Sequence, residues 1–128
     1  MSFEPRYGPE EVRRLVAQQT LGPFELYWIL HQHPLNQLTH CLGIPLVIAS
    51  VIVPVAGWFA AEVFLWQEWL LLGAAGWAFQ FLGHWVEGNA PAFVGDVRQL
   101  LIGPLFFLLK PYVWVWERRQ GRPYYAPE

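Results

Sequence analysis

Residues 41–61 have the sequence CLGIPLVIASVIVPVAGWFAA, which contains no charged side chain. A run of about 20 apolar residues is long enough to cross the hydrocarbon core of a bilayer, which is about 30 Å thick. A soluble domain would have difficulty burying such a stretch. The segment therefore predicts a membrane-spanning helix.

The residues on either side of this stretch extend it into a helical hairpin. Pro34 suits the first turn of a helix, so we expect the first span to cover residues 34–61. After a short polar turn, residues 65–83 form a second apolar segment. Residues 73–76 (GAAG) are small and allow helices to pack closely in lipid, within the chain or in a homo-oligomer.

The two ends of the chain look different from the hairpin. Residues 1–22 are expected to lie at the membrane interface, with an amphipathic helix over residues 10–19. A second short helix is expected over residues 24–33. A third hydrophobic segment, residues 97–116, is interrupted by prolines, so it could be a bent span, a re-entrant hairpin or an interfacial helix. The predicted fold is thus all-α, a multi-pass transmembrane bundle forming one domain over residues 1–128.

The charges indicate an orientation and exclude one class of partner. No Lys or Arg occurs between Arg14 and Arg98, whereas basic residues flank the apolar segments at both ends of the chain. The positive-inside rule therefore predicts cytoplasmic termini and an even number of crossings, in a bacterial inner membrane or the endoplasmic reticulum. A net charge of −2 argues against nucleic acid as a partner.

The histidines are expected to gather at one level of the membrane. His31, His33 and His40 lie near the start of the first span, and His84 lies near the end of the second. Antiparallel spans would bring these positions to the same face. A helix break at Pro34 would allow His31 to fold back towards His40.

Amide and acidic side chains accompany these histidines. Asn36 lies one helical turn before His40, and Gln80, His84 and Glu87 follow helical spacing on one stripe. Imidazoles beside such groups suit Fe, Zn or Mn. The spacing also fits histidines that only form hydrogen bonds at the interface, as in a non-enzymatic scaffold, or that contact a haem or quinone.

Two charged residues have similarly open roles. Glu25 could be a ligand, a proton carrier or a solvated acid at the interface. Lys110 could meet a substrate carboxylate or extend to the lipid headgroups. The single cysteine, Cys41, excludes a cysteine-rich metal site.

Two segments resemble a known family. They are residues 27–46 (YWILHQHPLNQLTHCLGIPL) and residues 80–92 (QFLGHWVEGNAPA). Both are similar to motifs of the 2-hydroxy fatty acid dioxygenases, small membrane proteins that include a fungal endoplasmic-reticulum enzyme of phytosphingosine breakdown. The resemblance extends over residues 27–109.

The resemblance implies Fe(II)-dependent α-oxidation at the membrane. A long-chain 2-hydroxy fatty acid and O₂ would give CO₂ and a fatty acid one carbon shorter. The implied metal ligands are His31, His40 and His84, with Glu87 as a further catalytic residue. The residues expected to support the ligands or the substrate are Asn36, Gln80, Asn89 and His33, and His33 stands where the family usually has another polar residue.

Overall fold

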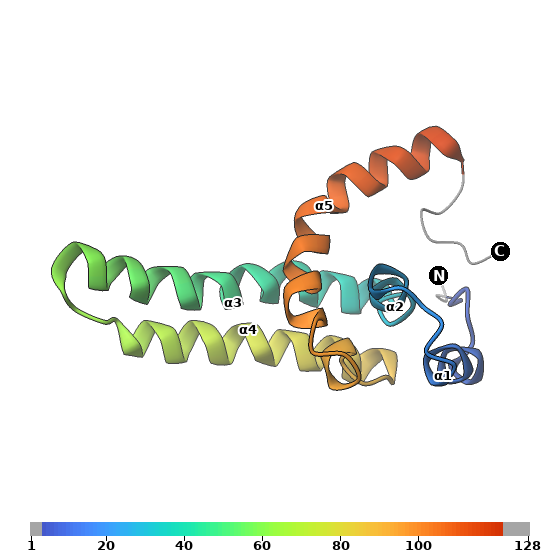
Figure 1. Ribbon diagram of the computed structural model, residues 1–128, viewed down its shortest axis with the longest axis horizontal. Coiled ribbons are helices and arrows are strands. Elements are labelled where there is room, and N and C mark those ends of the chain that lie inside the picture. Colours follow the sequence, from blue (N-terminus) through green and yellow to red (C-terminus); the bar gives the residue numbers. More distant parts are fainter. Residues whose placement is uncertain (1–3, 122–128) are drawn as a thin grey trace.

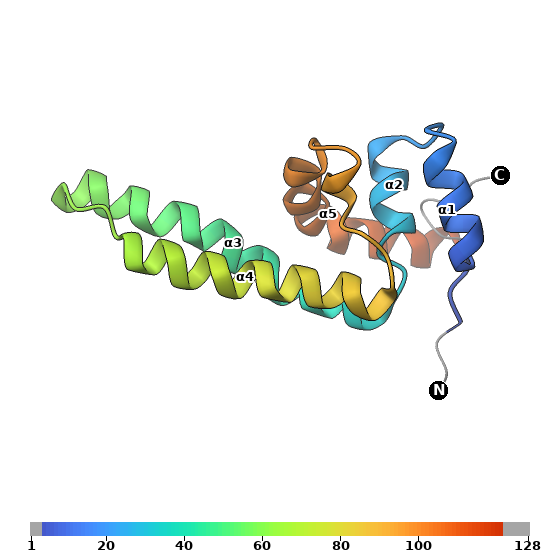
Figure 2. The ribbon, with the colours of Figure 1, turned by 90° about the horizontal axis from the view of Figure 1, so that it is seen from below.

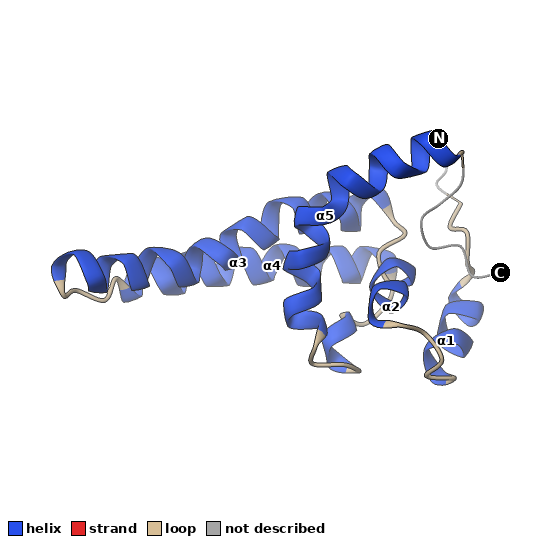
Figure 3. Cartoon of the chain, turned by 45° about the horizontal axis from the view of Figure 1, so that its top comes forward, coloured by secondary structure: helices blue, strands red, loops and turns tan. Residues whose placement is uncertain are grey.

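The protein is helical throughout the part that the computed structural model describes, residues 4–121. The elements are α1 (Pro9–Ala17), α2 (Pro23–Ile29), α3 (Pro34–Ala61), α4 (Trp66–Glu87), a single 3₁₀ turn η1 (Ala92–Val94) and α5 (Gln99–Gln120). Figure 3 shows no strand within these residues. The all-α prediction is confirmed.

Prolines and left-handed residues set the helix boundaries. Helices α1, α2 and α3 each begin with a proline, where the missing backbone donor would have no helical partner. The residues that directly follow α3 and α4, Glu62 and Gly88, both have positive φ. Helix α2 stops at Ile29, earlier than the expected His33, and α4 continues to Glu87 instead of ending at Gly83.

Helices α3 and α4 form a long antiparallel hairpin (Figures 1 and 2). They approach closely where Gly43 faces Gly76: a Cβ at Gly76 would lie 2.7 Å from Val47 Cγ2 and 2.9 Å from the Gly43 carbonyl oxygen. Gly76 therefore serves packing within the chain at this crossing. Helix α3 is one continuous helix with Pro45 and Pro54 in its interior.

The remaining elements surround one end of the hairpin. Buried Val12, Ile29, Leu30 and Ala92 join α1, α2 and η1 in a small hydrophobic cluster. Helix α5 contacts α2, α3 and η1. It is one continuous helix that changes direction partway along (Figure 1) and contains Pro104 and Pro111. Of the forms considered for this segment, the structure shows a bent helix and not a hairpin.

Much of the apolar surface has no covering within the chain. Large side chains such as Phe59, Leu71 and Leu101 are each more than 70% exposed. Helices α3 and α5 are long and apolar enough to cross a membrane. Helix α4, expected to be the second span, is not among the helices of residues 4–121 that are long and apolar enough by this measure, and its crossing stays a prediction.

Candidate metal centre

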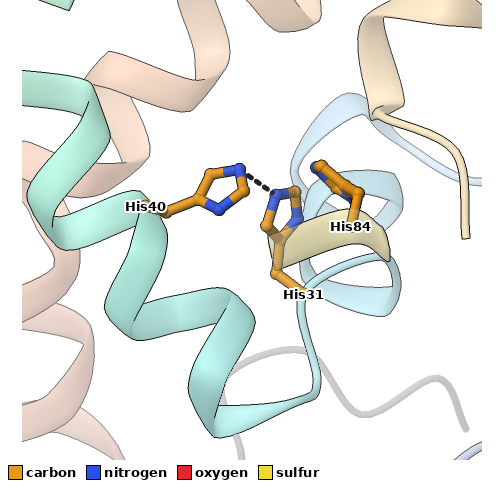
Figure 4. Close-up of side chains that lie close together, drawn as sticks. All are labelled: His31, His40 and His84. Atoms are coloured by element: carbon orange, nitrogen blue, oxygen red, sulfur yellow. Dashed lines mark hydrogen bonds between the residues drawn. The ribbon is translucent and has the colours of Figure 1, made fainter. Parts of the chain in front are cut away.

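Three histidines from three different elements meet at the end of the hairpin surrounded by the short helices. His31 lies in the turn after α2, His40 lies in the second turn of α3, and His84 lies in the last turn of α4. All three side chains are buried, and one nitrogen of each lies within 4.8 Å of the other two. Figure 4 shows their rings converging. The structure thus brings His31, His40 and His84 together at one end of the hairpin, as predicted from the sequence.

Each ring is oriented by a hydrogen bond from its Nδ1 to an oxygen. His31 Nδ1 faces the carbonyl oxygen of Tyr27, and His40 Nδ1 lies 2.9 Å from the carbonyl oxygen of Asn36. His84 Nδ1 lies 2.8 Å from Asn89 Oδ1. Because these oxygens only accept hydrogen bonds, the proton of each neutral ring resides on Nδ1. The Nε2 lone pairs are then free, as in histidines that ligate a metal.

The contact between two of the rings bears on what the cluster can bind. His31 Nε2 lies 3.0 Å from His40 Nε2. With both Nδ1 atoms protonated, two lone pairs face each other, which requires either an extra proton or a cation. Burial, followed by the nearby His40 and His84, lowers the pKa of His31 well below its usual range. An extra proton is therefore disfavoured, and the donor set fits a divalent metal ion.

A hydrogen-bond network fixes the turn that carries His31. The carbonyl oxygen of Leu30 accepts from Asn36 Nδ2 at 3.1 Å and from Asn89 Nδ2 at 3.0 Å. Glu87 accepts from the backbone N–H of Gln32 at 2.8 Å and from Asn36 Nδ2 at 2.6 Å. One network thus joins the turn, the start of α3 and the end of α4.

This network separates the candidate ligands from the residues that support them. Asn36 and Asn89 each contact a histidine of the cluster and the Leu30 carbonyl. Both oxygens of Glu87 accept hydrogen bonds, one from the turn and one from Asn36, and Glu87 lies outside the three-histidine group.

His33, Glu25 and Gln80 are not part of the three-histidine group. His33 precedes α3, and its Nδ1 accepts from the backbone N–H of Leu35. Glu25 caps α2 by accepting from the Gly22 backbone N–H at 2.9 Å. Gln80 is buried and lines a cavity of about 80 Å³ together with the three histidines. The walls of this cavity are otherwise mostly apolar.

Two residues of the site were not identified from sequence. The Tyr27 ring stacks on His31, with centroids 3.9 Å apart and an angle of 15° between the rings. Its spacing of four residues from His31 is a helical signal that could have indicated the contact. Gln99, at the start of α5, is buried, lines the same cavity and donates to the Pro23 carbonyl oxygen at 2.9 Å. No spacing to another site residue in the sequence indicates the position of Gln99.

These features define a class of protein: an all-helical chain with strongly apolar helices and a buried three-histidine candidate metal site. The comparison with known families agrees. Residues 19–113 match the family described as 2-hydroxy-palmitic acid dioxygenase Mpo1-like, and the chain belongs to this family. No curated protein and no solved structure matches the chain.

Proposed function

We propose that this protein is an Fe(II)-dependent dioxygenase that performs α-oxidation of long-chain 2-hydroxy fatty acids. The reaction consumes a 2-hydroxy acid and O₂ and yields CO₂, water and a fatty acid one carbon shorter. The observation that supports it best is the convergence of three buried histidine side chains in a member of this family. The metal's identity and the lipid substrate are part of the proposal.

In this proposal, some residues would bind the metal and others would orient the ligands. His31, His40 and His84 would hold it through Nε2, while Tyr27, Asn36 and Asn89 keep each Nδ1 protonated and each ring in place. Fe(II), when bound, supplies the one-electron chemistry that lets O₂ react with an acid. Three protein ligands would leave positions for substrate oxygens and O₂.

The surface of the protein suits a lipid substrate. The apolar cavity beside the histidines offers an environment for carbons next to the reacting group. The exposed apolar side chains on α3 and α5 suit a protein embedded in lipid. We propose an integral membrane protein with cytoplasmic termini, in a bacterial inner membrane or the endoplasmic reticulum, from which the fatty acid enters the site.

The test begins with anaerobic purification in detergent, metal analysis and O₂ uptake with a 2-hydroxy fatty acid. We expect bound iron, O₂ consumption that depends on the acid, and a product one carbon shorter. Replacing His31, His40 or His84 with Ala should lower bound metal and abolish turnover. His33→Asn is the matched control, since Asn can still cap α3.

Three results would contradict the proposal. One is metal-free protein that stays inert after Fe(II) is added, which would favour a structural role for the histidines. Another is a haem absorption band in the purified protein, which would favour the alternative cofactor. The third is full turnover in any one of the three Ala variants, which would remove that residue from the ligand set.

A further inference from the structure

Lys110 is the only lysine in the chain and occupies an unusual position. It follows the apolar residues 105–109 (LFFLL) in α5, a helix apolar enough to enter a membrane. The side chain is only partly exposed. A charge in such surroundings is costly and is generally retained where it has a partner or a function.

No carboxylate within residues 4–121 forms an ion pair with Lys110. Its Nζ instead donates to Gln37 Oε1 at 3.2 Å. Gln37 is itself held by the His31 turn, since its Nε2 donates to the carbonyl oxygen of His31 at 3.1 Å and to that of Gln32 at 3.4 Å. The ammonium group is thus positioned next to the histidine site by a neutral amide, with its charge uncompensated.

Lys110 also lines a small cavity on a second side of the histidines. This cavity, about 20 Å³ in volume, is lined by Lys110, Gln37, Cys41 and several aromatic residues, together with His31 and His40. That volume holds about one water-sized group. His31, His40 and Tyr27 also line the mostly apolar cavity of about 80 Å³. His31 and His40 therefore border both the small cavity that contains Lys110 and the larger, mostly apolar cavity.

This arrangement matches the two ends of an amphiphilic acid. We propose that Lys110 is the binding residue for the substrate carboxylate, and that the alkyl chain extends on the side of the apolar cavity. A 2-hydroxy acid has its carboxylate one bond from the carbon that bears the hydroxyl. By binding the carboxylate, Lys110 would hold this reacting end of the molecule next to His31 and His40. The identity of the acid rests on the proposed function.

The experiment compares binding of 2-hydroxyhexadecanoic acid with binding of its uncharged methyl ester, by anaerobic titration of the metal-loaded protein in nonionic detergent. Wild type should prefer the acid. Lys110→Met should weaken acid binding about tenfold or more, as expected for a lost hydrogen bond between charged groups, and leave ester binding unchanged. Lys110→Arg should retain most of the preference.

Arg119→Met is the matched control, because it removes one positive charge from the same helix at an exposed position. We expect it to behave as wild type. Bound metal should be equal in all variants, and KM for the acid should rise in Lys110→Met with little change in kcat.

Three outcomes would overturn the role of Lys110: a wild type without preference for the acid, a Lys110→Met variant that keeps the preference, or one that loses only affinity for vesicles containing phosphatidylglycerol. The last would assign the lysine to lipid headgroups. These outcomes differ from failure of the proposed function. Turnover with an unchanged KM in Lys110→Met would reject the lysine alone, whereas acid-selective binding without O₂ uptake would reject the dioxygenase alone.

Discussion

At the scale of single residues, the site depends on which nitrogen of each histidine is occupied by the protein. All three Nδ1 atoms face oxygens that belong to the chain, so all three Nε2 atoms remain for a shared partner. A histidine that only stabilised the interface would not need this common arrangement. The supporting oxygens are therefore as informative as the histidines.

Glu87 provides a test of the difference between a ligand and a positioning residue. In Glu87→Gln, an amide NH₂ replaces one of the two oxygens that accept from Gln32 and Asn36, so a donor faces a donor. We expect the free energy of unfolding to fall by about 1–3 kcal/mol, the range for a polar group left without its hydrogen-bond partner. Thermal unfolding in detergent measures this change.

Metal content separates the two roles of Glu87. We expect Glu87→Gln to bind as much metal as wild type when metal is in excess. Glu68→Gln, the same change at an exposed position of the same helix, should alter neither stability nor metal content. Loss of metal from Glu87→Gln at unchanged thermal stability would show that Glu87 is a ligand.

At the scale of helices, hydropathy and chain direction predict the hairpin and the common level of the histidines. They do not predict that α2 ends at Ile29. This end is stabilised by hydrogen bonds from Asn36 and Asn89 to the Leu30 carbonyl oxygen, and such contacts between separate segments cannot be deduced from local sequence. Hydropathy and chain direction also do not decide whether the C-terminal segment is a bent helix, a hairpin or an interfacial helix. A proline lowers the stability of a helix, but it does not determine whether contacts with neighbouring elements compensate for that loss. The Tyr27 carbonyl was equally unpredictable, since every residue has one.

The close crossing of α3 and α4 should position His40 relative to His84. In Gly76→Ala, the new Cβ would lie 2.8 Å from the Val47 backbone nitrogen, which cannot rotate away, so the helices must separate. We expect a loss of about 1–3 kcal/mol in unfolding free energy, typical of overpacking, together with weaker metal binding. Thermal unfolding and metal titration measure both effects.

Gly73→Ala is the control for this crossing. Its Cβ would lie 3.7 Å from Ser50, an ordinary van der Waals distance, although it is only three residues from Gly76. We expect it to keep wild-type stability and metal affinity. Equal behaviour of the two variants would show that the contact between Gly43 and Gly76 does not set the geometry of the site.

At the scale of the whole molecule, the hairpin separates its tip from the histidine site. Helix α3 has 28 residues, about 42 Å at about 1.5 Å per residue, which exceeds the hydrocarbon thickness of about 30 Å. If α3 and α4 both cross, the tip at residues 62–65 emerges on one side, while the histidines and the loop after α4 lie near the other. A lipid acid could then remain in the bilayer while its carboxylate reaches the site.

Cysteine labelling tests this crossing directly. In a Cys41→Ser background, a single cysteine replaces either Val63 at the tip or Ala90 in the loop after α4, both exposed. A membrane-impermeant maleimide should label Val63→Cys in right-side-out vesicles and Ala90→Cys in inverted vesicles, because the positive-inside rule places the termini and the histidine level in the cytoplasm. Labelling of both positions from the same side would reject the spanning hairpin, and exchange of the two patterns would reverse the orientation while keeping the crossing.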